Sequence, residues 1–320
     1  MAPDPTFAVQ AAVRRPWRDY LDALVPLRPD LHRYCCRLAG NVWDGEDLVQ
    51  DTLLRVFGLL GKVDADLERP RAYLLRTATH LWVDRMRRTT RERELLAAER
   101  ADALATRADA DPAQAAAVRE AAGAMLERLA PRERAAVLLK DVLDLSLEEI
   151  AAMLKTSVGA VKAALHRGRG RLAEAPDEGA DRAAPSRAIV DRFVAALAAK
   201  DLATLEAICS SDVTVELVGG AELETFARSR GFFEHAHFVL PELGFGADPH
   251  WKVAVYDGEP IVLGFRTLDG VVGLNEIHRI EESEGRIARV RCYCFCPDTL
   301  RAVADRLGVP ALRRPYRSPG

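Results

Sequence analysis

The stretch "LKTSVGAVKAALHRGRGRL", residues 154–172, indicates how the first half of the chain folds. It carries five Lys or Arg residues and no acidic residue, in a chain whose formal net charge is −3. At helical spacing, Val161 and Leu165 lie on one face and Lys162 and His166 on another. The pattern predicts a short helix that packs through an apolar face and presents a basic one.

The residues before this helix predict a partner for it. Ser146 and Glu149 form a capping box that begins an earlier helix, and Ser157 is a good N-cap for the basic helix. Only "KTS" separates the two helices, which is typical of a helix-turn-helix. The expected common core consists of Leu129, Val137, Leu138, Leu145, Ile150, Leu154, Val161 and Leu165.

A helix of this kind fits the major groove of DNA, where Lys and Arg reach phosphates and guanine edges. The outward residues are Ser157, Lys162, Ala163, His166, Arg167 and Arg169. The alternative is a solvated basic helix, the usual fate of a charge run. The capped preceding helix, the short turn and the lack of acidic residues favour the DNA-binding interpretation.

The first third of the chain predicts further helices. In residues 44–60, Val49, Thr52, Leu53 and Val56 share one face. The opposite face is acidic and polar with one exposed leucine. It would repel phosphate, so it is either solvated or binds a basic protein partner. This outward face comprises Asp47, Gln50, Asp51 and Leu54.

The next helix begins after Pro70 and ends in a basic cluster. Tyr73 and Trp82 precede that cluster, and aromatic residues beside basic ones suit partly single-stranded nucleic acid. The alternative is that both aromatic residues belong to the core, and for Trp82 this alternative is favoured. The candidate DNA-facing residues of this cluster are Arg85, Arg87 and Arg88, with Arg91 and Arg93 beyond them.

Residues 187–312 change pattern from helix to strand. Two helices with 3.6-residue periodicity come first, and strands dominate from Val213 onward, with a hairpin turn at Asp257-Gly258. The expected fold of this part is α+β, with a curved antiparallel sheet and helices packed on it. "CYCFC", residues 292–296, is expected to continue the last strand.

The first half of the chain resembles a known family. "RYCCRLAGNVWDGEDLVQDTLLRVF" and "PRAYLLRTATHLWVDRMRR" resemble region 2 of an extracytoplasmic-function (ECF) sigma factor. Residues 126–172 are similar to sigma region 4. The resemblance implies that core RNA polymerase contacts Asp47, Gln50, Asp51, Leu54 and Arg55. It also implies that the −35 promoter element meets Ser157–Arg167 and that the −10 element meets His80, Asp84, Arg85, Arg87 and Arg88. His80 departs from the Asn usual in the family.

The C-terminal part resembles the SnoaL-like fold, a cone-shaped α+β barrel, through "VDRFVAALAAKDLATLEAICSSDVTVELVGG". Some ECF sigma factors carry such a domain, which tunes their activity. Gly219-Gly220 and Pro297-Asp298 with Leu300 are what remains here of two motifs usual in that group. The resemblance also makes this domain a candidate site for a small-molecule ligand.

No catalytic residue is expected. Glu276, His278, Tyr256 and Tyr293 are strand residues that could face a cavity, yet no pair of them forms a recognisable catalytic motif. One possibility is a zinc site made by Cys292, Cys294 and Cys296, with Cys209 or His278 as the fourth ligand. A straight strand spreads three alternate cysteines over about 13 Å, so buried thiols acting as small apolar side chains are favoured. We therefore expect neither a metal nor a cofactor.

The sequence thus predicts a multidomain fold: two all-α sigma domains, a region 2 bundle and a region 4 helix-turn-helix, plus a SnoaL-like barrel. No apolar run approaches the roughly 20 residues that span a bilayer, so no membrane association and a cytoplasmic location are expected. A polymerase-independent regulator with a ligand-binding domain is the alternative, which the acidic face disfavours. The expected divisions are domains at 1–93, 121–175 and 187–312, linkers at 94–120 and 176–186, and a tail at 313–320.

Overall fold

The computed structural model describes residues 19–20, 22–60, 70–100, 129–172, 184–234, 247–268 and 270–312. The chain divides into two compact units, Met1–Ala180 and Asp181–Gly320. The 94–120 and 176–186 linkers and the 313–320 tail, predicted from composition, lie mostly or wholly outside the described residues.

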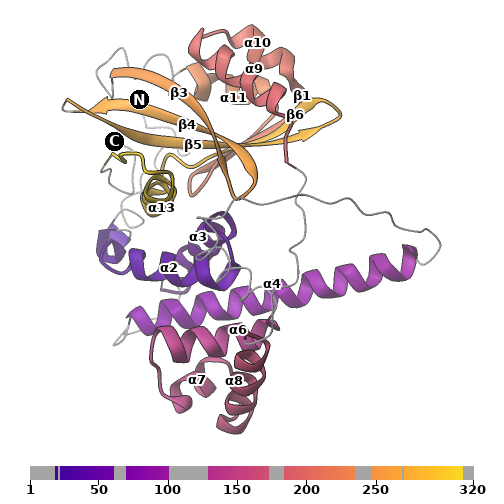
Figure 1. The fold of residues 1–320 in the computed structure, drawn as a ribbon, viewed down its shortest axis with the longest axis vertical. Coiled ribbons are helices and arrows are strands. Elements are labelled where there is room, and N and C mark those ends of the chain that lie inside the picture. The colour runs from indigo at the N-terminus through magenta and orange to yellow at the C-terminus, as the bar shows by residue number, and fades with distance from the viewer. Residues whose placement is uncertain are drawn as a thin grey trace, which may run out of the picture. The chain divides into compact units, whose positions relative to one another are not determined.

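An N-terminal bundle is formed by α2 (Arg28–Ala39), α3 (Val42–Leu60) and α4 (Pro70–Arg100) (Figure 1). Helix α2 ends at Ala39, because the next residue, Gly40, takes a left-handed conformation with φ 90°. Helix α4 begins at Pro70, as predicted. It continues to Arg100, so residues 94–100, which were assigned to a linker, are helical.

The core of the bundle confirms the predicted inner face of α3. Val49, Thr52, Leu53 and Val56 are all buried, with at most 1% of each exposed. Glu46 is also fully buried, and its carboxylate accepts a hydrogen bond from Arg28 at 2.5 Å. Since a buried carboxylate is costly without a partner, this ion pair allows α2 and α3 to pack closely.

A helix-turn-helix module follows, formed by α6 (Pro131–Val137), the π-helical turn η1 (Leu138–Val142), α7 (Leu147–Met153) and α8 (Val158–Leu172). The predicted capping box is present: Ser146 Oγ accepts from the Glu149 N–H at 3.1 Å, and Glu149 accepts from the Ser146 N–H at 2.9 Å. Ser157 Oγ accepts from the Ala160 N–H at 3.2 Å. The helix-turn-helix prediction is confirmed.

The C-terminal unit is α+β, as predicted. Helices α9 (Arg187–Ala198), α10 (Leu202–Ile208) and α11 (Phe226–Phe232) gather on one side of a curved sheet, and α13 (Pro297–Leu307) packs beside β5 (Figure 1). The strands are β1 (Cys209–Leu217), β2 (Ala221–Glu224), β3 (Ala247–Tyr256), β4 (Glu259–Leu268), β5 (Val271–Ser283) and β6 (Arg286–Cys292).

The sheet order corrects one prediction. The six strands are arranged β2-β1-β6-β5-β4-β3, and β1 pairs with β6 in parallel, so the sheet is mixed rather than antiparallel. β1 is the first strand of this sheet along the chain and β6 is the last, yet the two are hydrogen-bonded neighbours that run in the same direction. Asp257-Gly258 forms the expected hairpin turn, with φ 50° and 77°.

The expected strand over "CYCFC" is wrong. Strand β6 ends at Cys292, a turn follows, and Cys296 is the N-cap residue of α13. Pro297 cannot donate to a sheet ladder but is well suited to the first turn of a helix, so it favours an end to the strand. Cys292 and Cys296 are fully buried.

None of the described helices is both long and apolar enough to cross a lipid bilayer.

Two glycines of α3 offer a matched test of the bundle packing. A Cβ at Gly45 would lie 2.6 Å from the Cα of Cys36, whereas a Cβ at Gly58 would meet nothing within 4 Å. Gly45→Ala should destabilise the protein by roughly 1–3 kcal/mol because two backbones must separate. Gly58→Ala should be neutral or stabilise by up to about 1 kcal/mol through helix propensity. Urea unfolding followed by circular dichroism checks both, and equal effects would contradict the packing described.

Candidate nucleic-acid and polymerase interfaces

Helix α8 presents its basic face to solvent. Lys162, Ala163, His166 and Arg167 are exposed, whereas Val161 and Leu165 are 0% and 5% exposed and hold the helix to the module. The turn before α8 relies on Lys155, which takes a left-handed conformation with φ 48°. The structure therefore brings the predicted −35 residues together on one outward surface.

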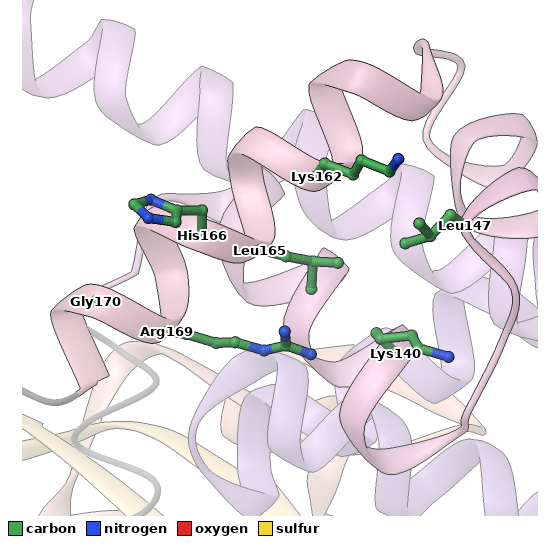
Figure 2. Close-up of a pocket in the computed structure, with 7 residues that line it drawn as sticks. All are labelled: Lys140, Leu147, Lys162, Leu165, His166, Arg169 and Gly170. Carbon is green, nitrogen blue, oxygen red and sulfur yellow. The ribbon is translucent and has the colours of Figure 1, made fainter.

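A pocket of about 730 Å³ lies beside this surface. Figure 2 shows the side chains of Lys140, Lys162 and Arg169 around it, with the aliphatic Leu147 and Leu165 between them. His166 and Gly170 complete the lining. Two of these cations already pair with carboxylates, Lys140 with Asp144 at 2.9 Å and Arg169 with Asp141 at 2.5 Å, so much of the positive charge around the hollow is neutralised.

The orientation of α8 depends on Glu133, which sequence reasoning did not single out. Glu133 is 4% exposed, and its carboxylate accepts from Arg167 at 2.8 Å and from Arg171 at 2.5 Å. It also accepts from the Ala130 N–H at 3.2 Å, at the start of α6. One carboxylate thus joins the start of α6 to the far end of α8.

The same packing needs Gly168. A Cβ at this position would lie 2.9 Å from Val137 Cγ2, so only glycine lets α8 approach α6 this closely. The residue after Gly168, Arg169, forms an ion pair with Asp141 at 2.5 Å. The sequence gives only weak signals for this contact between α6 and α8. They are an acidic residue two positions after Pro131, and two glycines between arginines.

The outward face of α3 forms a second surface. Asp51, Leu54 and Arg55 are exposed, and Asp47 and Gln50 are half-buried. Leu54 has 58% of its surface exposed, and it is among the few large apolar residues described that are this accessible. Asp51 pairs with Arg85 of α4 at 2.6 Å. An exposed leucine among polar groups is typical of a site that a protein partner covers.

The residues predicted to meet the −10 element lie along α4. Asp84, Arg87 and Arg88 are exposed, and Arg87 pairs with Asp84 at 3.6 Å. Trp82 is 3% exposed, which confirms it as a core residue rather than a stacking platform. His80 is half-buried, and its Nε2 lies 2.5 Å from the carbonyl oxygen of Met153.

The helix-turn-helix module contacts the N-terminal bundle, and the sequence pattern does not predict these contacts. Arg134 donates to the carbonyl oxygen of Leu38 at 2.9 Å, and its guanidinium lies 5.1 Å from the ring centroid of Trp82. His80 adds the contact with Met153. Since Arg134 follows Arg132 and Glu133 in a run of charged residues, nothing in the sequence pattern distinguishes it from a solvated arginine.

In the C-terminal unit, the structure brings together two of the four strand residues that were expected to be able to face a cavity, Glu276 and His278. Glu276 Oε2 lies 3.5 Å from His278 Nε2, and both residues are buried. Tyr256 lies apart from them, under the guanidinium of Arg306. The ring of Tyr293 lies beneath the guanidinium of Arg291.

Comparison with known protein families matches both helical parts of the chain. The family "Sigma-70 region 2" matches residues 25–92, which contain α2, α3 and most of α4. The family "Sigma-70, region 4" matches residues 119–172, which contain the helix-turn-helix module.

Relatives extend the likeness into the C-terminal unit. The chain is 32% identical to ECF RNA polymerase sigma factor SigJ of Mycobacterium tuberculosis over 248 residues, 73% of this chain and 77% of that protein. It is 28% identical to the probable ECF RNA polymerase sigma factor SigI of the same species over 301 residues, 91% of this chain and 96% of that protein. A crystal structure of SigJ matches with 22% identity and a TM-score of 0.32, over 86% of this chain and 96% of that one.

These matches agree with the sequence resemblance, and the C-terminal helices and curved sheet are the architecture expected of a SnoaL-like domain. The chain belongs to the ECF RNA polymerase sigma factors.

Proposed function

We propose that the outward face of α3 is the surface that docks on core RNA polymerase. Sigma factors act with core polymerase and promoter DNA, so the chain needs one surface for each. The carrying observation is the exposed Leu54 beside Asp51, on a face that cannot bind DNA because it is acidic. Asp47, Gln50 and Arg55 border this leucine and would set the orientation of docking through polar contacts.

The promoter contacts are assigned to the two basic surfaces. Lys162, Ala163 and His166 of α8 would enter the major groove of the −35 element, with Ser157 at the start of the helix. Arg167 donates to Glu133 through its Nε and would contact the DNA through its two terminal nitrogens. Asp84, Arg85, Arg87 and Arg88 of α4 would lie against the opened −10 element. Because each surface is small, neither would hold the promoter alone, and polymerase would supply the rest of the affinity.

His80 cannot serve the promoter while its ring contacts the Met153 carbonyl oxygen. The contacts of Arg134 with Leu38 and Trp82 hold the helix-turn-helix module in the same arrangement. We therefore propose that this arrangement is a closed form, which opens when region 2 and region 4 reach their separate sites on polymerase and promoter.

The C-terminal domain would tune this opening, and a small molecule bound in it is the proposed signal. The domain is joined to the helical unit through the predicted linker 176–186, which carries Pro176, Gly179 and Pro185. The relatives SigJ and SigI match over enough of their length to include a C-terminal part. No catalytic role is proposed for it.

The docking surface is tested with two exposed aliphatic residues. Leu54→Ala should raise the Kd of the full chain for core RNA polymerase about tenfold, which is the loss expected when an apolar hot spot is removed. Val255→Ala should leave the Kd unchanged, because Val255 is equally accessible, at 62%, but lies in the C-terminal unit. Fluorescence-detected titration of polymerase measures both. Similar Kd values for Leu54→Ala and the wild type would contradict the proposal.

The tuning role is tested by removing the C-terminal unit. A chain that ends at Ala180, the boundary between the two compact units, should direct several-fold more promoter-specific transcript than the full chain. The reason is that the helical unit would open without restraint. In vitro transcription with core polymerase at equal sigma concentration measures the ratio. Equal or lower output from the truncated chain would refute an inhibitory C-terminal domain.

A further inference from the structure

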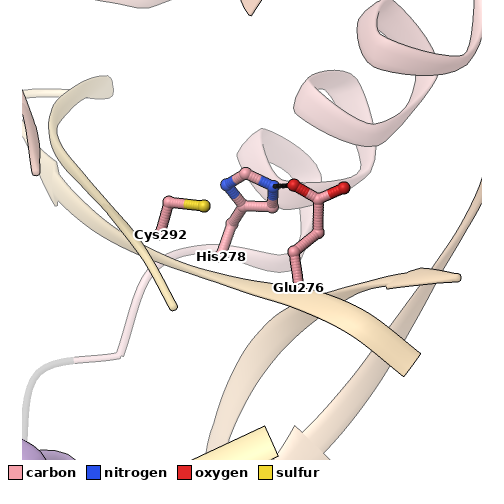
Figure 3. Close-up of side chains that lie close together, drawn as sticks. All are labelled: Glu276, His278 and Cys292. Atoms are coloured by element: carbon pink, nitrogen blue, oxygen red, sulfur yellow. Dashed lines mark ion pairs between the residues drawn. The ribbon is translucent and has the colours of Figure 1, made fainter. Parts of the chain in front are cut away.

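Glu276, His278 and Cys292 form a buried cluster that promoter recognition does not use (Figure 3). Within the described residues, each can offer one donor atom such that all three atoms lie within 4.8 Å of one another. The exposed fractions of the residues are 3%, 0% and 0%. A carboxylate, an imidazole and a thiol are seldom buried together, because burying charged or polar groups costs free energy unless they are paired or bind a metal.

The backbone assembles this cluster from two neighbouring strands. Glu276 and His278 alternate on β5 and so share one face of the sheet, and the register places Cys292 of β6 opposite His278. The pairing of β4 with β5 shifts between Gly264 and Phe265, which marks a bulge at Asn275. Such bulges re-aim side chains and are common beside functional sites.

Gly264 provides the room for Glu276. A Cβ at Gly264 would lie 2.6 Å from Cγ of Glu276 and 2.5 Å from the indole ring of Trp251. The strand position opposite Glu276 is therefore kept empty of a side chain, so that the carboxylate fits between the sheet and the indole.

The surroundings hold the cluster rigidly. Rings of Phe193 and Trp251 lie 5.8 Å and 5.5 Å from the ring of His278, centroid to centroid. Arg266 donates to Glu276 Oε1 at 3.1 Å, and Glu276 Oε2 lies on the side of His278. A partner that binds one carboxylate oxygen and orients the other is the usual outer support of a metal ligand.

We propose that Glu276, His278 and Cys292 bind one zinc ion in the C-terminal domain, with a water molecule as the fourth ligand. Zinc prefers four ligands in a tetrahedron, and Zn–S of about 2.3 Å with Zn–N of about 2.0 Å places ligand atoms roughly 3.5 Å apart. The Nε2–Oε2 distance of 3.5 Å already matches this spacing.

Charge also favours a divalent ion. On binding, the Cys292 thiol loses its proton to solvent and its sulfur forms a bond to the metal. The Glu276 carboxylate and the Cys292 thiolate then carry the two negative charges that balance the metal, and the imidazole remains neutral. Magnesium and calcium are disfavoured because they need several oxygen ligands, whereas sulfur and imidazole suit zinc.

The experiment uses the full chain, stripped of metal, reduced and titrated with Zn²⁺ or with Co²⁺ as a spectroscopic probe. The expected result is one ion retained per chain, with a thiolate-to-cobalt charge-transfer band. Cys292→Ser and Glu276→Gln should each weaken zinc binding by tenfold or more, since each removes one ligand. Cys209→Ser is the matched control, a buried cysteine of the same unit outside the cluster, and it should bind like the wild type.

Two results would overturn the proposal: a wild-type chain that retains no zinc and shows no charge-transfer band, or binding that persists in both ligand variants. Circular dichroism of each variant shows whether it folds. Should Cys292→Ser fail to fold, the wild-type cobalt spectrum decides by itself, because a buried ion pair beside a packed thiol gives no such band.

Discussion

The orientation of the recognition helix depends on the buried carboxylate of Glu133. It accepts hydrogen bonds from Arg167 and Arg171 of α8 and from the start of α6, so two helices share one anchor. Gly168 lets them approach. Because the carboxylate is removed from water, its loss would leave these arginines without their charge partner. That anchor decides which face of α8 is outward, and therefore which residues can reach a promoter.

The surfaces assigned to the two partners of a sigma factor differ in charge. An acidic surface with an exposed Leu54 suits a protein partner, and the basic surfaces of α4 and α8 suit DNA. The contacts of Arg134 and His80 link the two helical regions in the closed form. Opening would exchange these few polar contacts for larger surfaces on polymerase and promoter, which is the behaviour expected of a factor that acts only when assembled.

Local patterns in the sequence predict most of the helical unit. The caps at Ser146 and Ser157, the buried face around Val49 and the exposed Lys162 all follow from helical spacing, because each depends on residues within a few turns. The parallel pairing of β1 with β6 could not be predicted, since it joins segments far apart in the chain. The same holds for long-range contacts such as that of Arg134 with Leu38. The cluster around His278 depends on strand register and a bulge, which spacing alone does not reveal.

Site-specific photocrosslinking within an initiation complex tests the division of interfaces most directly. A photoreactive residue is placed at Ala163, at Leu54 or at Val255 of the full chain bound to core polymerase and promoter DNA. The account predicts that Ala163 crosslinks to DNA upstream of the start site, that Leu54 crosslinks to polymerase, and that Val255 does neither. Crosslinking of Ala163 to polymerase alone, or of Leu54 to DNA, would contradict it.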